Sequence, residues 1–144
     1  MSLKRQRIGI AVVEHDGRYL VGVRGENGPL PGFSEFPGGK CLDGESPEHG
    51  AARECAEETG LAVEIVDALY QRDFDYPHAR VALHFYLCRP RGPVAERHQD
   101  FHWVSATALR DLKFPPANQP VVELLVNRAL REVRDADGMG EPGR

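Results

Sequence analysis

The amino-terminal part of the chain contains two segments rich in hydrophobic and β-branched residues, at 7–14 and 18–24. His15-Asp16-Gly17 separates them, and a short break of this composition between two such segments is typical of an antiparallel hairpin. The Gly- and Pro-rich segment 25–34 predicts a loop. A short strand is expected at 33–37, directly before two glycines.

A second, longer hairpin is predicted farther along the chain. Segments 61–75 and 80–88 alternate or cluster apolar residues on either side of a Pro-containing turn at 76–79. A short strand at 101–104 and one or two helical turns at 105–112 follow.

Two segments indicate α-helices. In the first, Ser46 is a favourable N-cap, Pro47 suits the first helical position and Gly60 ends the helix. In the second, 120–134, apolar residues recur at helical spacing. The remaining residues, 135–144, are polar and Gly-rich, which predicts a disordered tail.

Length and composition favour one domain. The chain has 144 residues and a net charge of −4, and it contains neither an internal repeat nor a linker. We therefore expect one α+β domain over 1–134, with a mixed or antiparallel sheet and helices packed on its faces. Cys41, Cys55 and Cys88 form no CxxC pair and are expected to be reduced packing residues.

The apolar stretches are far shorter than the ~20 residues that cross a bilayer, so no membrane helix is expected. The first residues do not have the pattern of a signal peptide, which indicates a cytoplasmic protein. An acidic chain is also unsuited to holding nucleic acid through its surface charge. If it handles phosphates, the positive charge must come from another source.

One face of the first helix has an unusual concentration of carboxylates. Glu54, Glu57 and Glu58 stand at positions i, i+3 and i+4, so they share an arc of about 100°. Like charges at this spacing destabilise a helix. The face expected to pack against the sheet consists of small residues: Ala52, Cys55, Ala56 and Thr59.

Such a carboxylate cluster has two interpretations. It is a solvated helix face, or it supplies the hard oxygen ligands that Mg²⁺ or Mn²⁺ requires. Arg53 precedes Glu57 by four residues and can pair with it. Glu45, just before the helix, could add a carboxylate or orient a water molecule.

The spacing decides between these interpretations. From Gly39 the order is five residues, Glu45, seven residues, Arg53-Glu54-Cys55, one residue, Glu57-Glu58, one residue, and Gly60-Leu61. This pattern resembles the motif of the Nudix hydrolases at every fixed position. The resemblance implies a Nudix-type α/β/α sandwich with a mixed sheet. It also implies hydrolysis of nucleoside diphosphates linked to another moiety, with divalent ions.

The resemblance also implies roles for single residues. Glu54, Glu57 and Glu58 become metal ligands, and the Gly38 carbonyl an additional one. Glu54 is the candidate catalytic base, Arg53 an orienting residue and Glu45 a carboxylate that supports the site. In the loop before Trp103, the position of a further carboxylate ligand matches Arg97, with Glu96 next to it. We take Glu96 as the candidate.

Similarity to the MutT-type members covers about residues 7–130 and is carried by EFPGGK, PHARVALHFYLCR, the WV pair and FPPAN. It implies that Asn118 reads the edge of an oxidised guanine, since an amide both donates and accepts. Capping of the last helix is the alternative role for Asn118. Phe36 and Tyr76 are candidate walls for the base, and Arg24 and Lys40 are further candidate substrate-binding residues.

The expected function is that of a Mg²⁺-dependent nucleoside triphosphate pyrophosphohydrolase, with Mn²⁺ as a substitute, that converts 8-oxo-dGTP to 8-oxo-dGMP and pyrophosphate. A pyrimidine nucleotide (CTP or dCTP) or ADP-ribose pyrophosphatase is the alternative within the family. A non-catalytic nucleotide-binding module is the alternative from another class. The expected partner is a nucleotide, without stable nucleic acid binding or membrane contact, and the expected state is a monomer or dimer.

Overall fold

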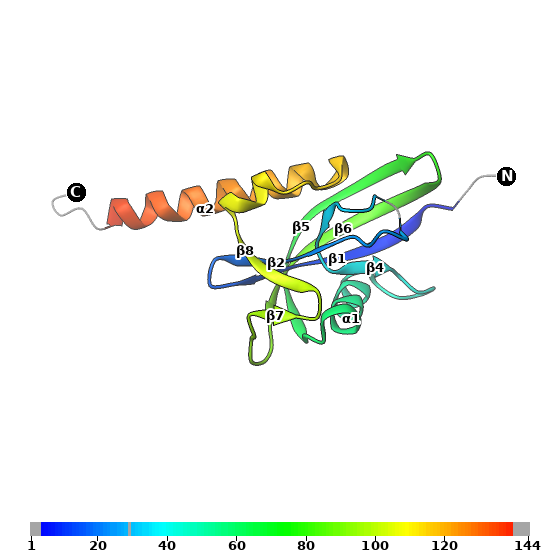
Figure 1. Ribbon diagram of the computed structural model, residues 1–144, viewed down its shortest axis with the longest axis horizontal. Coiled ribbons are helices and arrows are strands. Elements are labelled where there is room, and N and C mark those ends of the chain that lie inside the picture. Colours follow the sequence, from blue (N-terminus) through cyan, green and yellow to red (C-terminus); the bar gives the residue numbers. More distant parts are fainter. Residues whose placement is uncertain (1–3, 29, 140–144) are drawn as a thin grey trace.

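The computed structural model describes residues 4–28 and 30–139 (Figure 1). Its elements, in chain order, are β1 (Gln6–His15), β2 (Arg18–Val23), β3 (Ser34–Glu35), β4 (Gly38–Lys40), α1 (Pro47–Thr59), β5 (Val63–Tyr76), β6 (Ala79–Pro90), β7 (Arg97–His98), β8 (Phe101–Ser105), the 3₁₀ helices η1 (Thr107–Asp111) and η2 (Pro116–Asn118), and α2 (Gln119–Met139).

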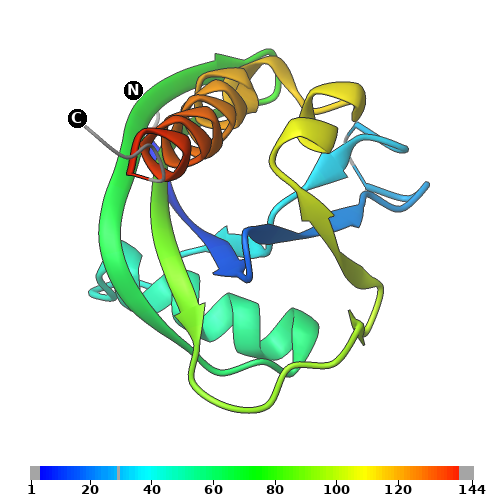
Figure 2. The same cartoon turned by 90° about the vertical axis from the view of Figure 1, so that its left-hand side faces the viewer.

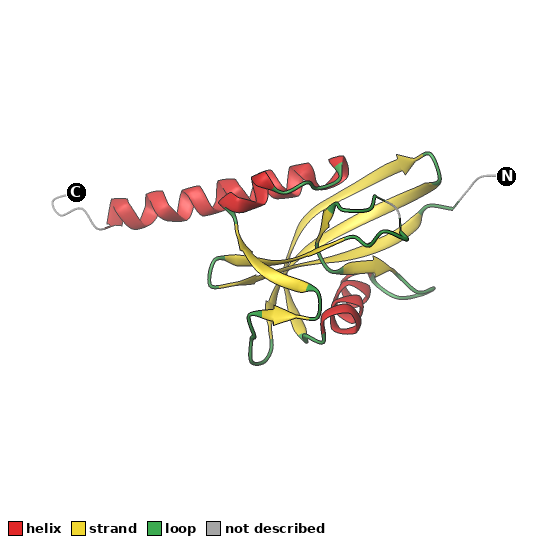
Figure 3. Cartoon of the chain, in the orientation of Figure 1, coloured by secondary structure: helices red, strands yellow, loops and turns green. Residues whose placement is uncertain are grey.

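The strands form one mixed sheet, as the sequence predicts (Figure 3). Its order is β5-β6-β1-β2-β8-β7, with β3 paired to β2 and β4 paired to β1. Both expected hairpins, β1–β2 and β5–β6, are confirmed as antiparallel pairs. The parallel pair is β1 with β6, two strands far apart in the sequence. This pairing places β1 in the interior of the sheet.

Alternation along β1 separates two hydrophobic cores. Ile10 and Val12 belong to a core that also contains buried residues of α2. Ala11 and Val13 point to the other face, into a core with Ala51 of α1. Figure 2 shows α1 and α2 on opposite sides of the sheet. The fold is thus a sandwich with a sheet between two helical layers.

The ends of α1 follow the sequence closely. The Ser46 side chain accepts a hydrogen bond from the His49 amide, and Pro47 occupies the first turn. Gly60 adopts the left-handed conformation, with φ of 76°, and its N–H donates to the Ala56 carbonyl. The helix therefore begins and ends where the sequence predicts.

The second helix is longer than expected. α2 follows η2 without a break and continues to Met139, so 135–139 are helical rather than disordered. Just before this segment, Arg128 and Glu132 form an ion pair 3.5 Å apart, at the i, i+4 spacing that stabilises a helix. The rest of the predicted tail, 140–144, lies outside the described residues.

Two further expectations can be compared with the described residues. No helix among them is long and apolar enough to cross a bilayer. The three cysteines are buried free thiols, as the sequence predicts for packing residues.

Candidate active site

A cavity of about 360 Å³ opens beside β4 and reaches the β5–β6 turn and η2. Its size is within the range of small-molecule sites. Segments far apart in the sequence form its lining: Ile8, Ile10, Arg24, Leu30, Glu35, Phe36, Gly38, Gly39, Lys40, Tyr76, His78, Ala79, Val81, Leu83 and Asn118.

The carboxylate face of α1 lies against the β4 edge of this cavity. A Cβ atom on Gly39 would lie 2.5 Å from the carboxyl carbon of Glu54, so a side chain there would displace the Glu54 carboxylate. Glu58 is hydrogen-bonded to the Gly38 backbone. The two glycines of β4 therefore contact α1 through the side chains of Glu54 and Glu58, which are four residues apart.

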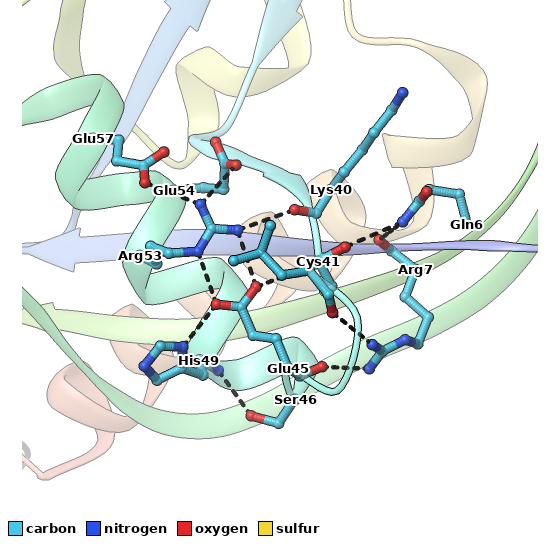
Figure 4. A network of polar contacts seen from close by, with 11 residues as sticks. Gln6, Arg7, Lys40, Cys41, Glu45, Ser46, His49, Arg53, Glu54 and Glu57 are labelled. Carbon is cyan, nitrogen blue, oxygen red and sulfur yellow. Dashed lines mark hydrogen bonds and ion pairs between the residues drawn. The ribbon is translucent and has the colours of Figure 1, made fainter.

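Arg53 is the centre of a polar network on this face (Figure 4). Its guanidinium donates to Glu45 through Nε (2.8 Å) and Nη2 (3.0 Å), and Nη2 also donates to the Lys40 carbonyl (3.1 Å). Nη1 donates to Glu54 (3.1 Å) and to Glu57 (3.0 Å). The expected pair between Arg53 and Glu57 is confirmed. One cation thus faces three carboxylates.

Glu45 is the best-enclosed carboxylate of the network, with 7% of its side chain exposed. It also accepts from the Leu42 amide (3.0 Å), and its second oxygen lies 2.8 Å from His49 Nδ1. The Arg53 guanidinium, followed by the Leu42 and His49 hydrogen bonds, holds the pKa of Glu45 well below its usual range. Glu45 is therefore a fixed anion that holds Arg53 in place.

Glu58 has the opposite electrostatic environment. Burial raises the pKa of its carboxyl to about 7, and the charges of Glu35 and Glu54 add to the shift. Burial also raises the pKa of Glu35, against the opposing effect of Arg24. The helix and the cavity wall thus share an excess of negative charge, which would attract a cation.

Aromatic rings also line the cavity. Phe36 is buried and stacks on Phe114, with centroids 5.0 Å apart. Tyr76 stacks on His78, with centroids 5.4 Å apart, at the β5–β6 turn. Both Phe36 and Tyr76 line the cavity, where their rings form apolar walls.

Asn118 is 8% exposed and lines the same cavity at the end of η2. None of the side-chain hydrogen bonds in the described part of the chain joins Asn118 to the first turn of α2, which is what capping would require. Arg24 Nε lies 3.8 Å from Glu35 on another wall of the cavity, and Lys40 lies at its rim.

The family model of the NUDIX domain matches residues 9–124, which include the whole α1 network. The chain belongs to the Nudix family. This match agrees with the spacing of the motif and with the sandwich architecture, and together with the relatives described next it identifies the protein as an enzyme, a MutT-type Nudix hydrolase.

Individual relatives of this Nudix hydrolase have different names. The 8-oxo-dGTP diphosphatase of Escherichia coli is 29% identical over 85% of this chain and 98% of its own length. The CTP pyrophosphohydrolase of the same bacterium is 28% identical over 94% and 100%. A structure described as MutT from Aliivibrio salmonicida and Vibrio cholerae superposes with a TM-score of 0.70, at 31% identity over 87% and 98%.

The donor set of the Nudix hydrolase suits a hard divalent cation, since it consists of carboxylates and a backbone carbonyl. Among the described residues, however, no three His, Cys, Asp or Glu side chains converge as a metal site. Glu54 and Glu57 instead direct an oxygen to Arg53. The residues fit the ion by their chemistry, and Glu35 and Glu54 lie near enough to Glu58 for their charges to add to the rise in its pKa that burial causes.

Glu96 is not brought to the α1 carboxylates. It lines a separate cavity of about 510 Å³ together with His15, Arg18 and Trp103. The cause is local pairing, because β7 pairs with β8 and the Trp103 indole donates to the Ala95 carbonyl at 2.8 Å. This geometry does not support the sequence-based choice of Glu96 as a ligand.

Two other details differ from the sequence analysis. Ala56 is exposed, whereas Ala51 is fully buried in the core between α1 and the sheet. Glu35 and His78 line the cavity although neither was a candidate. Glu35 lies in the EFPGGK segment and His78 in the Pro-containing turn, so both motifs contained a signal that could have identified them.

Proposed function

We propose that this Nudix hydrolase is a divalent-metal-dependent nucleoside triphosphate pyrophosphohydrolase that converts 8-oxo-dGTP to 8-oxo-dGMP and pyrophosphate. One observation carries the proposal: Asn118 and the glycines of β4 line the same cavity. A nucleotide could thus place its base at Asn118 and its phosphates beside β4, next to the α1 carboxylates, within one cavity.

Glu54, Glu57, Glu58 and the Gly38 carbonyl would hold the ion, which we expect to be Mg²⁺ with Mn²⁺ as a substitute. When bound, the ion would neutralise phosphate charge and lower the pKa of a water molecule. It would also supply the positive charge that an acidic chain lacks for binding a polyphosphate.

Side chains carry out the proton transfer and hold the catalytic carboxylate in position. Glu54 accepts the proton of the water that attacks the β-phosphorus, and pyrophosphate and the monophosphate separate. Arg53 keeps one oxygen of Glu54 in a fixed direction through their 3.1 Å hydrogen bond. Glu45 fixes Arg53 in turn, because its two oxygens bind Nε and Nη2.

The aromatic walls and the amide select the base. Phe36 and Tyr76 offer apolar faces to a planar ring. Asn118 can donate to one base atom and accept from its neighbour. Arg24 and Lys40 add positive charge near the cavity.

A pyrimidine triphosphate is the second candidate, because the CTP pyrophosphohydrolase relative matches 94% of this chain. ADP-ribose is a further candidate substrate within the family. A non-catalytic binding module is disfavoured by the retained carboxylates, since three like charges on one face have an energetic cost without a ligand.

A panel of nucleotides tests the proposal. The protein is assayed with Mg²⁺ on 8-oxo-dGTP, dGTP, CTP, dCTP and ADP-ribose, and pyrophosphate and monophosphate are measured. We expect the highest kcat/KM for 8-oxo-dGTP and no turnover with a chelator. A higher kcat/KM for CTP or dCTP would show that pyrimidine nucleotides are the substrates. Nucleotide binding without hydrolysis would support the non-catalytic module.

A further inference from the structure

The loop 41–46 joins β4 to α1 and carries Glu45, so its position sets that of the Arg53 network. The loop is attached to the first strand. Arg7 of β1 donates through Nη1 to the Glu45 carbonyl and through Nη2 to the Leu42 carbonyl, the latter at 3.2 Å. Figure 4 shows the Arg7 side chain at the edge of the network, on the far side of Glu45 from Arg53.

The alternation of β1 explains why Arg7 reaches this loop. Arg7, Gly9 and Ala11 share the face of the strand that packs on α1. At Gly9, an added Cβ atom would lie 2.4 Å from the Pro47 carbonyl oxygen, so the start of α1 rests directly on the strand. Two residues earlier, the longer Arg7 side chain extends under the loop that precedes the helix.

Arg7 has no substitute in this role. Within the part of the chain that the structure describes, it is the one side chain that donates to the carbonyls of 42–45. The neighbouring Gln6 side chain donates to the Arg7 carbonyl (3.2 Å) and, in the loop, to the Cys41 carbonyl (3.4 Å), but not to Leu42 or Glu45 among the described hydrogen bonds. The backbone contact from the Cys41 amide to the Arg7 carbonyl fixes the start of the loop but not Glu45.

We propose that Arg7 is a positioning residue of the active site, which fixes the backbone at Leu42 and Glu45 and thereby the direction of the Glu45 carboxylate toward Arg53. The catalytic part of this inference rests on the proposed function. Loss of the two hydrogen bonds should leave Phe36 and Tyr76 in place. It should loosen Glu45, and with it Arg53, which orients Glu54 and Glu57. Turnover should therefore fall more than substrate binding.

Arg5 provides a matched control. It lies two residues from Arg7, donates to Asp75 (2.7 Å) and to the Val81 carbonyl (3.2 Å), lies 3.5 Å from Asp73, and makes no hydrogen bond to the loop among the described residues. Removal of either guanidinium deletes two hydrogen bonds at the same end of the sheet. Only the Arg7 bonds lead to Glu45.

The experiment compares Arg7→Met, Arg7→Lys and Arg5→Met in the full chain. For Arg7→Met we expect kcat to fall about 10- to 100-fold, because the catalytic carboxylates would be misplaced, and KM to change less than about twofold. Hydrogen exchange at the Leu42 and Glu45 amides, which bond within the loop, should accelerate. Arg7→Lys retains one charged donor and should recover part of kcat, whereas Arg5→Met should keep both kcat and the exchange rates.

Each outcome bears on the inference. A normal kcat or unchanged hydrogen exchange in Arg7→Met would overturn it. Equal falls in kcat in Arg7→Met and Arg5→Met would do the same. So would a fall in kcat that is explained entirely by a lower temperature of unfolding. If the wild-type protein hydrolyses no nucleotide, the proposed function fails, while the exchange measurement still tests whether Arg7 fixes the loop.

Discussion

The two parts of the active-site region differ in how the chain builds them. The carboxylate part comes from a single helix, since Arg53, Glu54, Glu57 and Glu58 lie within six residues. The other part, which we propose binds the base and call the base-binding part, takes Arg24, Phe36, Tyr76 and Asn118 from separate segments that only the folded sheet brings together. Helix periodicity alone orders the first part, whereas the second depends on strand pairing.

The two parts also differ in charge. The carboxylate part is crowded with anions, and its one internal cation, Arg53, contacts three of them. The base-binding part is formed mainly by rings and aliphatic side chains. Changes to the first part should therefore affect every substrate, whereas changes to the second should affect the choice among substrates.

The largest effect is expected from Glu57→Gln, which removes a carboxylate from α1 and keeps its shape. Turnover should fall on the order of 10²- to 10³-fold for every nucleotide, because charge stabilisation at the phosphates is lost. Glu57 is more than half exposed, so thermal unfolding should change little. Glu48→Gln on the same helix is the control. Near-normal activity of Glu57→Gln in Mg²⁺ would contradict the assigned metal site.

A smaller effect is expected from Asn118→Ala, which removes the amide from the base-binding part. The ratio of kcat/KM for 8-oxo-dGTP to that for dGTP should fall about tenfold or more, the usual scale for one paired base contact. Turnover of nucleotides that do not need the amide should persist. Asn127→Ala, an exposed change on α2, serves as the control. Unchanged selectivity would show that Asn118 does not read the base.

The smallest effect concerns stability and pH at Glu58. Its pKa is raised to about 7 in the folded protein, so the folded state holds a proton that the unfolded chain releases at lower pH. The stabilisation from this proton is complete below the unfolded pKa of ~4.3 and is lost as the pH rises toward 7. Without metal, Glu58→Gln should thus gain stability over wild type from pH 5 to 8, measured by urea unfolding. A constant difference would show that Glu58 titrates normally.

The sequence predicts features that neighbouring residues determine. Ser46 and Gly60 fix the ends of α1 through hydrogen bonds to the adjacent turn. The pair of Arg53 with Glu57 follows from their four-residue spacing. The placement of the carboxylates on one face of α1 could therefore be predicted from the sequence, whereas the direction of each carboxylate could not.

Features that depend on distant segments escaped the prediction. The parallel pairing of β1 with β6 joins residues more than 70 positions apart, and no local pattern specifies it. The contact of Arg7 with Glu45 likewise requires β1 to lie beneath the loop. These contacts follow from the topology of the sheet.

β1 belongs to both parts of the site, and its alternation keeps them separate. Ile8 and Ile10 face the cavity, whereas Gly9 and Ala11 face α1. Natural or laboratory selection can therefore reshape the pocket for another base at the even positions, while the odd positions continue to carry the hydrolytic helix. Substitutions on one face of a single strand could thus change the substrate without changing the reaction.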